Sequence, residues 1–221
     1  MTADTSAGTT TDPTTGTTTD TTTDTAVDTA VDVIDTLAGI RPGSRLDLLR
    51  DRRPDAREHA QRAYEALFAP DSEQEVTLVE RVALAAFVAG LHQDPAVARH
   101  YADRLAEHAP DLRTTIEREI EASRTVGPYG VYDEPALAQE SLIGPAYRAG
   151  RRAALDERLA AALDHAHLLV FRPRESSRDA LKRLLDAGWT TTGVVTISQL
   201  VAFLTFQIRV VAGLRLLGAD R

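Results

Sequence analysis

The chain of 221 residues contains no cysteine. Without a thiol it cannot form a disulfide, hold an iron–sulfur cluster or a thiolate zinc site, or act as a thiol peroxidase or thiol redox sensor. The sequence also lacks a glycine-rich phosphate loop and the G-x-S-x-G, H-E-x-x-H and EF-hand patterns. It therefore gives no support for nucleotide binding, and we expect no cofactor.

Residues 1–30 contain no Lys, Arg, Leu, Ile or aromatic residue and consist mostly of Thr and Asp. This composition cannot bury enough apolar surface to offset the entropy of ordering, so it predicts a disordered tail. The tail has no basic region followed by an apolar one, as a secretory signal has, and we expect a cytoplasmic location. The rest of the chain is nearly balanced, with 28 acidic and 25 basic residues. This balance argues against nucleic acid and anionic membranes as partners.

Residues 31–221 are expected to form one all-α domain, because apolar residues recur at spacings of three and four and no strand-length alternation is sustained. The clearest helix covers residues 78–92. It begins with a Thr77-x-x-Glu80 capping box and continues as a dense apolar run, which is typical of a central core helix. Asp94 and Pro95 are expected to begin the next helix as its N-cap and first residue.

Further helices are expected at residues 54–68, 110–121, 147–170 and 191–217, with another beginning after Ser176 or Ser177. The irregular stretch of residues 124–146 is long for a compact domain, which favours a lid or an interface arm. The last helix is the most apolar, but Gln207 and Arg209 are among the polar residues that interrupt it. We therefore predict that it is not a membrane span and that an oligomer interface buries it.

Two segments carry a family resemblance: residues 78–101 (LVERVALAAFVAGLHQDPAVARHY), and residues 185–190 (LDAGWT) running into 195–209 (VTISQLVAFLTFQIR). Together with VIDTLAGIRPGS and GPYGVY, they resemble the carboxymuconolactone decarboxylase (CMD) and AhpD-like alkylhydroperoxidase superfamily, in particular its cysteine-free CMD domain branch. The resemblance implies an AhpD-like helical bundle assembled as a homo-oligomer.

In peroxidase-active members of this superfamily, a C-x-x-C motif follows the buried helix, with a His four residues beyond it. Aligning that His with His100 places the two Cys positions near Gln93 and Ala96, and an alignment shifted by one residue places them at Asp94 and Val97, with Tyr101 at the His position. Peroxide reduction needs a thiolate nucleophile and a resolving thiol, and these residues supply neither. We therefore predict no dithiol-dependent peroxidase activity.

The decarboxylase side of the superfamily needs no Cys and implies acid–base chemistry next to a carbonyl. The family's Glu position falls on Glu80, and His92 and His100 are the candidate imidazoles. Each residue also has a structural interpretation: Glu80 as the capping-box partner of Thr77, His92 as a charge at a helix C-terminus, and His100 as an ordinary surface or core residue.

The resemblance offers Arg209 as a candidate for binding a substrate carboxylate. The structural alternative is a buried ion pair or an interfacial hydrogen bond, with Glu80 as one candidate counter-charge. Tyr129 and Tyr132 are expected in an interface arm or a pocket wall, where they would contact substrate.

No metal site is expected. His92, His100 and His108 recur every eight residues, but eight residues rotate a helix by about 80°, so His100 and His108 diverge. His165 and His167, two residues apart, lie on opposite sides of a helix.

The sequence thus favours an oligomeric CMD/AhpD-like protein that binds a small molecule or has a vestigial site. One alternative is a non-catalytic partner subunit of a Cys-containing alkylhydroperoxidase-domain protein. Another is an acid–base decarboxylase or isomerase using Glu80 with His92 or His100. Convergence of the Glu80 carboxylate and an imidazole on a closed cavity would favour the enzyme.

Overall fold

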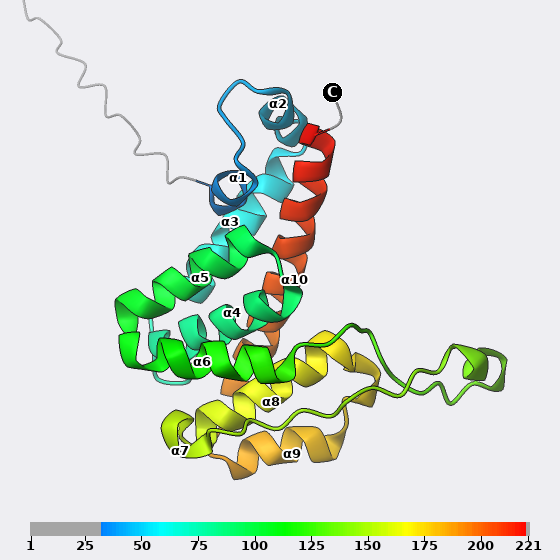
Figure 1. The fold of residues 1–221 in the computed structure, drawn as a ribbon. Helices are drawn as coiled ribbons and strands as arrows, with labels where there is room; N and C mark the ends of the chain where they lie inside the picture. The colour runs from blue at the N-terminus through cyan, green and yellow to red at the C-terminus, as the bar shows by residue number, and fades with distance from the viewer. Residues whose placement is uncertain (1–31, 220–221) are drawn as a thin grey trace, which may run out of the picture. The chain divides into compact units, whose positions relative to one another are not determined.

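The computed structural model describes residues 32–219 (Figure 1). Within these residues every regular element is a helix, so the all-α prediction is confirmed. The predicted disorder of residues 1–30 lies outside the described residues. The elements in chain order are α1 (Val33–Ala38), α2 (Arg45–Asp51), α3 (Pro54–Phe68), α4 (Leu78–His92), α5 (Pro95–His108), α6 (Pro110–Ser123), η1 (Pro135–Glu140), α7 (Arg152–Leu155), α8 (Glu157–Phe171), η2 (Pro173–Glu175), α9 (Arg178–Asp186) and α10 (Thr191–Ala219).

Helix α4 lies at the centre of the fold because it is apolar around nearly its whole circumference. Its residues 81–91 are all buried, and α5, α6, α8 and α10 all contact it. The predicted capping box fixes its start: the Thr77 hydroxyl accepts from the Glu80 N–H at 3.2 Å, and the Glu80 carboxylate accepts from the Thr77 N–H at 2.8 Å. Asp94 caps α5 by accepting from the N–H groups of Ala96 and Val97. Both capping predictions are confirmed.

Gly90 lets α4 approach α6 closely. A Cβ placed at Gly90 would lie 2.5 Å from Cδ1 of Ile120, and 2.9 Å from two further atoms of that branched side chain. We expect Gly90→Ala to lower the free energy of unfolding by about 1–2 kcal/mol, because overpacking outweighs the better helix propensity of alanine. Urea denaturation measures this loss. The double variant Gly90→Ala, Ile120→Ala should lose less unfolding free energy than the sum of the losses in the two single variants. If the two losses are strictly additive, the contact between residues 90 and 120 is contradicted.

The prediction of one long helix over residues 147–170 is wrong in its first part. Residues 147–151 have irregular backbone, α7 is a single turn, and α8 begins only at Glu157. Asp156 has a positive φ of 62° and caps α8, accepting from the N–H of Leu159 at 2.8 Å. We call residues 147–151 the clamped segment, because two buried carboxylates hold its backbone.

Two buried carboxylates hold the clamped segment and prevent it from joining the helix. Glu119 of α6 accepts from the N–H groups of Gly150 at 3.2 Å and Arg151 at 2.9 Å, while Asp164 of α8 accepts from the N–H of Ala149 at 2.7 Å. These backbone donors are therefore satisfied by side chains instead of by helical carbonyls. Tertiary contacts override a local pattern that favours a helix.

Residues 124–146 form an arm that projects away from the helices and turns back at η1 (Figure 1). Its two limbs are joined by a pair of backbone hydrogen bonds between Gly130 and Leu142, at 2.8 and 3.0 Å. Its root is fixed to the end of α8, where the Tyr129 N–H donates to the Phe171 carbonyl at 2.6 Å. The predicted long irregular stretch is confirmed as this arm.

Helix α10 contacts α1, α4 and α8 along its length. Among the described residues it is also the one helix long and apolar enough, by length and composition, to cross a membrane. Core helices pass the same test, and 39% of its most apolar stretch is buried inside the protein. The expectation that it does not span a membrane stays a prediction.

Candidate functional site

Glu80 ties together the start of α4, the start of α8 and the turn before α10. Besides closing the capping box, its carboxylate pairs with Nε of Arg158 at 2.6 Å. The Arg158 guanidinium stacks on the Trp189 ring at 3.8 Å, and the Trp189 indole donates to the Arg158 carbonyl. The structural interpretation of Glu80 is confirmed, and its carboxylate is fully engaged. The suggested Glu80–Arg209 ion pair is wrong, because Arg158 takes that place.

His92 lies at the other end of α4, about 18 Å along the helix axis from Glu80. Its Nε2 is 3.3 Å from the Thr205 hydroxyl of α10. Burial, and then the positive charge of Arg209, lower the pKa of His92 below its ordinary value. Arg209 itself is exposed on α10. The structure therefore brings His92 and Arg209 near one another and keeps both away from Glu80.

His100 faces α3 instead of α4. Its Nε2 is 3.4 Å from the Tyr64 hydroxyl, which also accepts from Arg104. Burial, followed by the charge of Arg104, lowers the pKa of His100. The three residues predicted to be catalytic, Glu80, His92 and His100, thus have separate partners on separate helices. Within residues 32–219 their side chains are therefore held at three different places.

The two tyrosines belong to the arm. The Tyr129 hydroxyl lies 2.8 Å from the Thr125 hydroxyl, and the Tyr132 ring is covered by the Arg174 guanidinium at 3.8 Å. Neither contacts Arg209 in the described residues, so the predicted substrate-binding set is not assembled within one chain.

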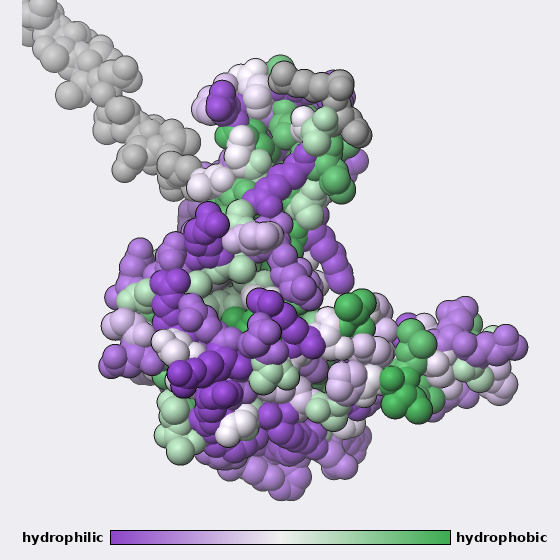
Figure 2. Space-filling model, viewed as in Figure 1, coloured by the Kyte–Doolittle hydropathy of each residue, from purple (hydrophilic) through white to green (hydrophobic). Residues whose placement is uncertain are grey.

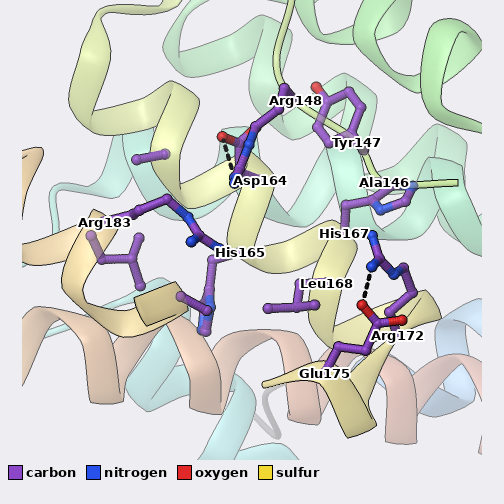
Figure 3. A pocket seen from close by; sticks show the side chains of 13 residues that line it. Ala146, Tyr147, Arg148, Asp164, His165, His167, Leu168, Arg172, Glu175 and Arg183 are labelled. Carbon is purple, nitrogen blue, oxygen red and sulfur yellow. Dashed lines mark hydrogen bonds and ion pairs between the residues drawn. The ribbon is translucent and has the colours of Figure 1, made fainter. Parts of the chain in front are cut away.

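A different set of residues does converge. A cavity of about 190 Å³ lies between α8, α9, η2 and the polypeptide just before and within the clamped segment (Figure 3). Its polar lining includes Arg148, Asp164, His165, Arg172 and Arg183. Figure 3 shows the Arg183 side chain extending from α9 toward His165 on α8. A neighbouring cavity of about 240 Å³ shares Arg148, Asp164 and Arg183.

His165 is 5% exposed, and its Nδ1, like the Nε of Arg172 in the same cavity, is a buried nitrogen without a partner among residues 32–219. Its Nε2 is 2.9 Å from the Ser198 hydroxyl, which itself donates to the Val194 carbonyl at 2.7 Å. A hydroxyl has one proton, so Nε2 is assigned as the donor and Nδ1 as an acceptor. Burial lowers the pKa of His165 to about 4, so the ring is neutral at pH 7.

Three arginines give the cavity a positive balance. Arg148 pairs with Asp164 at 3.2 Å, and Arg172 pairs with Glu175. Arg183 has no hydrogen-bond or ion-pair partner among residues 32–219. The cavity thus presents a free guanidinium and a neutral imidazole acceptor, a combination that suits a ligand with both an anionic group and a hydrogen-bond donor.

His165 and His167 do not act together as ligands for a metal ion, because their ring nitrogens have different partners. His167 donates from Nε2 to the Ser123 carbonyl at 3.1 Å and stacks against Tyr147 at 4.9 Å between ring centres. In the described part of the chain no group of three or more His, Cys, Asp or Glu residues could hold a metal ion. Sequence reasoning considered His165 only as a metal ligand; the signal it missed is a polar Asp-His-Ala-His run inside an otherwise apolar helix.

The chain was compared with known proteins. No protein-family model matches it, and no curated protein is similar to it. The resemblance to the CMD and AhpD-like superfamily therefore depends on the sequence motifs described above.

Proposed function

We propose that this chain is a cysteine-free CMD/AhpD-like protein that binds a small hydroxycarboxylate in the cavity between α8 and α9. It has no thiol chemistry, is cytoplasmic, and works as a homo-oligomer. The helical order supports the family part of the proposal: the buried helix α4 carries Glu80 near its start, a break follows, and a Gly188-Trp189-Thr190 turn leads into the long α10.

One observation carries the ligand proposal: His165 and Arg183 line the same cavity, and within residues 32–219 neither the Nδ1 of His165 nor the guanidinium of Arg183 has a partner. A buried acceptor without a partner costs free energy that a ligand donor recovers. A carboxylate satisfies Arg183, and a hydroxyl on the neighbouring carbon donates to His165. Asp164 is already occupied by Arg148, Arg152 and the clamped segment, so it positions the wall of the cavity.

The acid–base alternative using Glu80 with His92 or His100 has no support in the geometry, since the three side chains have separate partners. The partner-subunit alternative differs from ours in its test: a Cys-containing alkylhydroperoxidase-domain protein would co-purify with the chain from its own cells, and the α8–α9 cavity would play no part in that association.

Lactate and propionate test the ligand proposal, because they differ only in the hydroxyl that would donate a hydrogen bond to His165. We expect isothermal titration to show lactate binding more tightly than propionate. Arg183→Ala should weaken lactate binding severalfold, because Arg183 is exposed and an exposed ion pair contributes about 0.2–1 kcal/mol. Arg178→Ala, an exposed position on the same helix outside the cavity, is the matched control and should bind as the parent does.

Equal affinities for lactate and propionate would contradict the role of His165. Equal lactate affinities in the Arg183→Ala and Arg178→Ala variants would contradict the anion site. If glycolate, lactate and malate all fail to bind, the proposed ligand class is wrong.

A further inference from the structure

We propose that the arm of each chain docks into an apolar groove on α10 of a second copy, so that two copies exchange arms. This deepens the homo-oligomer in the proposed function and does not depend on the carboxylate site. The groove is defined by Leu169 of α8 with Val201, Ala202, Phe206, Arg209 and Val210 of α10, and we call it the α10 groove.

The arm carries apolar side chains that the described part of its own chain leaves more than half exposed. Ile143 is 91% exposed and Val126 is 80% exposed, and Val131 and Leu142 are also more than half exposed. Figure 2 shows apolar surface gathered in two places along the projecting arm. Exposed apolar side chains concentrated on one projecting segment mark an interaction surface.

The α10 groove matches the exposed side chains of the arm in its apolar character. It is an open hollow of about 750 Å³, and its lining is mostly apolar, with Phe206 49% exposed at its edge. It is large enough to receive several of the arm's aliphatic side chains. Its position on α10 also agrees with the sequence expectation that an oligomer interface buries this helix.

Charge favours the arm over other occupants of the groove. The arm, residues 124–146, contains three acidic residues, Asp133, Glu134 and Glu140, and one basic residue, Arg124 at its root, so its net charge is negative. The charged residue of the groove is Arg209, which is exposed and has no ion-pair partner among the described residues. An acidic apolar arm and an apolar groove with one cation are electrostatically complementary.

The position of the arm's root makes the exchange reciprocal. The Tyr129 N–H is bonded to the carbonyl of Phe171, two residues beyond Leu169 at the groove wall. Arm root and groove are therefore neighbours, and a two-fold axis can bring each arm over the other copy's groove. Because the Gly130–Leu142 bonds already hold the arm in shape, little entropy is lost when it docks.

The absence of cysteine allows a clean cross-linking test on the full chain. Ile143→Cys marks the arm, Ala202→Cys marks the groove, and both positions are exposed in the single chain, so folding is preserved. With a short bismaleimide, a mixture of the two variants after subunit exchange should give a covalent dimer. Each variant alone should give little or none.

A cross-linked dimer of Ile143→Cys alone would show that arms contact arms, and one of Ala202→Cys alone would show that α10 contacts α10; either result overturns the proposal. A monomer by native mass spectrometry, or a dimer without cross-linking in the mixture, also overturns it. These results are independent of lactate binding, so this proposal and the ligand proposal can fail separately.

Disruption and repair give a second test. We expect Ile143→Asp and Ala202→Glu each to abolish the dimer in native mass spectrometry, whereas Leu48→Asp, an exposed position on α2, leaves it intact. Mixing Ile143→Asp with Ala202→Glu should restore part of the dimer, because one intact arm then meets one intact groove. Failure of the mixture to associate would contradict arm exchange.

Discussion

Replacing Glu119 by alanine is expected to lower the free energy of unfolding by about 2–4 kcal/mol. The side chain is 1% exposed and accepts hydrogen bonds from the Tyr147 hydroxyl at 2.6 Å, from two backbone N–H groups and from the Arg151 guanidinium. Hydrogen bonds to a charged group contribute more than neutral ones, and their donors lose their partner together. The clamped segment would then be released from α6, and the root of the arm with it.

Two variants separate the charge of Glu119 from its shape. Glu119→Gln keeps an acceptor for Tyr147 and should lose roughly half as much stability. Glu117 is exposed on the same helix and, among the described residues, pairs with Arg113 alone, so Glu117→Ala should change stability by at most about 0.5 kcal/mol. Urea denaturation followed by circular dichroism measures the stability of all three variants. Equal losses of stability in Glu119→Ala and Glu117→Ala would contradict the role of Glu119 in holding the clamped segment.

The Glu119 carboxylate also accounts for part of the loss of protein stability at low pH. Burial alone would raise the pKa of Glu119, but the hydrogen bonds from Tyr147, Gly150 and Arg151 outweigh it and hold the pKa below the ordinary 4.5. Its stabilisation is therefore complete above pH 4.5 and is lost as the pH falls through the folded-state pKa. The Glu119→Gln variant should lack this part of the acid loss.

Local signals in the sequence predicted most helices and their ends. The Thr77–Glu80 capping box and the Asp94-Pro95 start are properties of a few neighbouring residues, and both were located correctly. The recurrence of apolar residues predicts a helix that begins at residue 147. Hydrogen bonds to the carboxylates of Glu119, 32 residues from Arg151, and Asp164, 15 residues from Ala149, prevent it, and a periodicity argument cannot detect such contacts.

The candidate site was harder to predict from the sequence than the helices, because it also depends on contacts between distant residues. Glu80 was considered catalytic because of its family position, yet its partner Arg158 lies 78 residues away. The unpaired nitrogen of His165 is a property of the surrounding fold, because α10 supplies a partner for one ring nitrogen and no residue from 32 to 219 supplies one for the other. Single-sequence reasoning identifies residues with suitable chemistry; which of them are left without a partner is decided by packing.

His165 should make the protein sensitive to mild acid. Its ordinary pKa is 6.5 and its folded-state pKa is about 4, so between these values the unfolded chain binds a proton that the native chain does not. Stability therefore falls as the pH falls from 6.5 to 4, by about 1.4 kcal/mol per pH unit at most and about 3 kcal/mol in total. Below pH 4 this residue contributes no further loss.

His165→Asn removes the titrating group while keeping a polar side chain on α8. We expect the stability of the variant to vary less steeply between pH 4 and 6.5 than that of the parent, whereas His108→Asn, at an exposed position on α5, leaves the steepness unchanged. Subtracting the variant's curve from the parent's isolates His165 from His92, His100 and His167, whose pKa values burial also lowers. Identical slopes in parent and His165→Asn, or an NMR titration of His165 near pH 6.5, would show that the ring is solvated and that the cavity offers a ligand no buried acceptor.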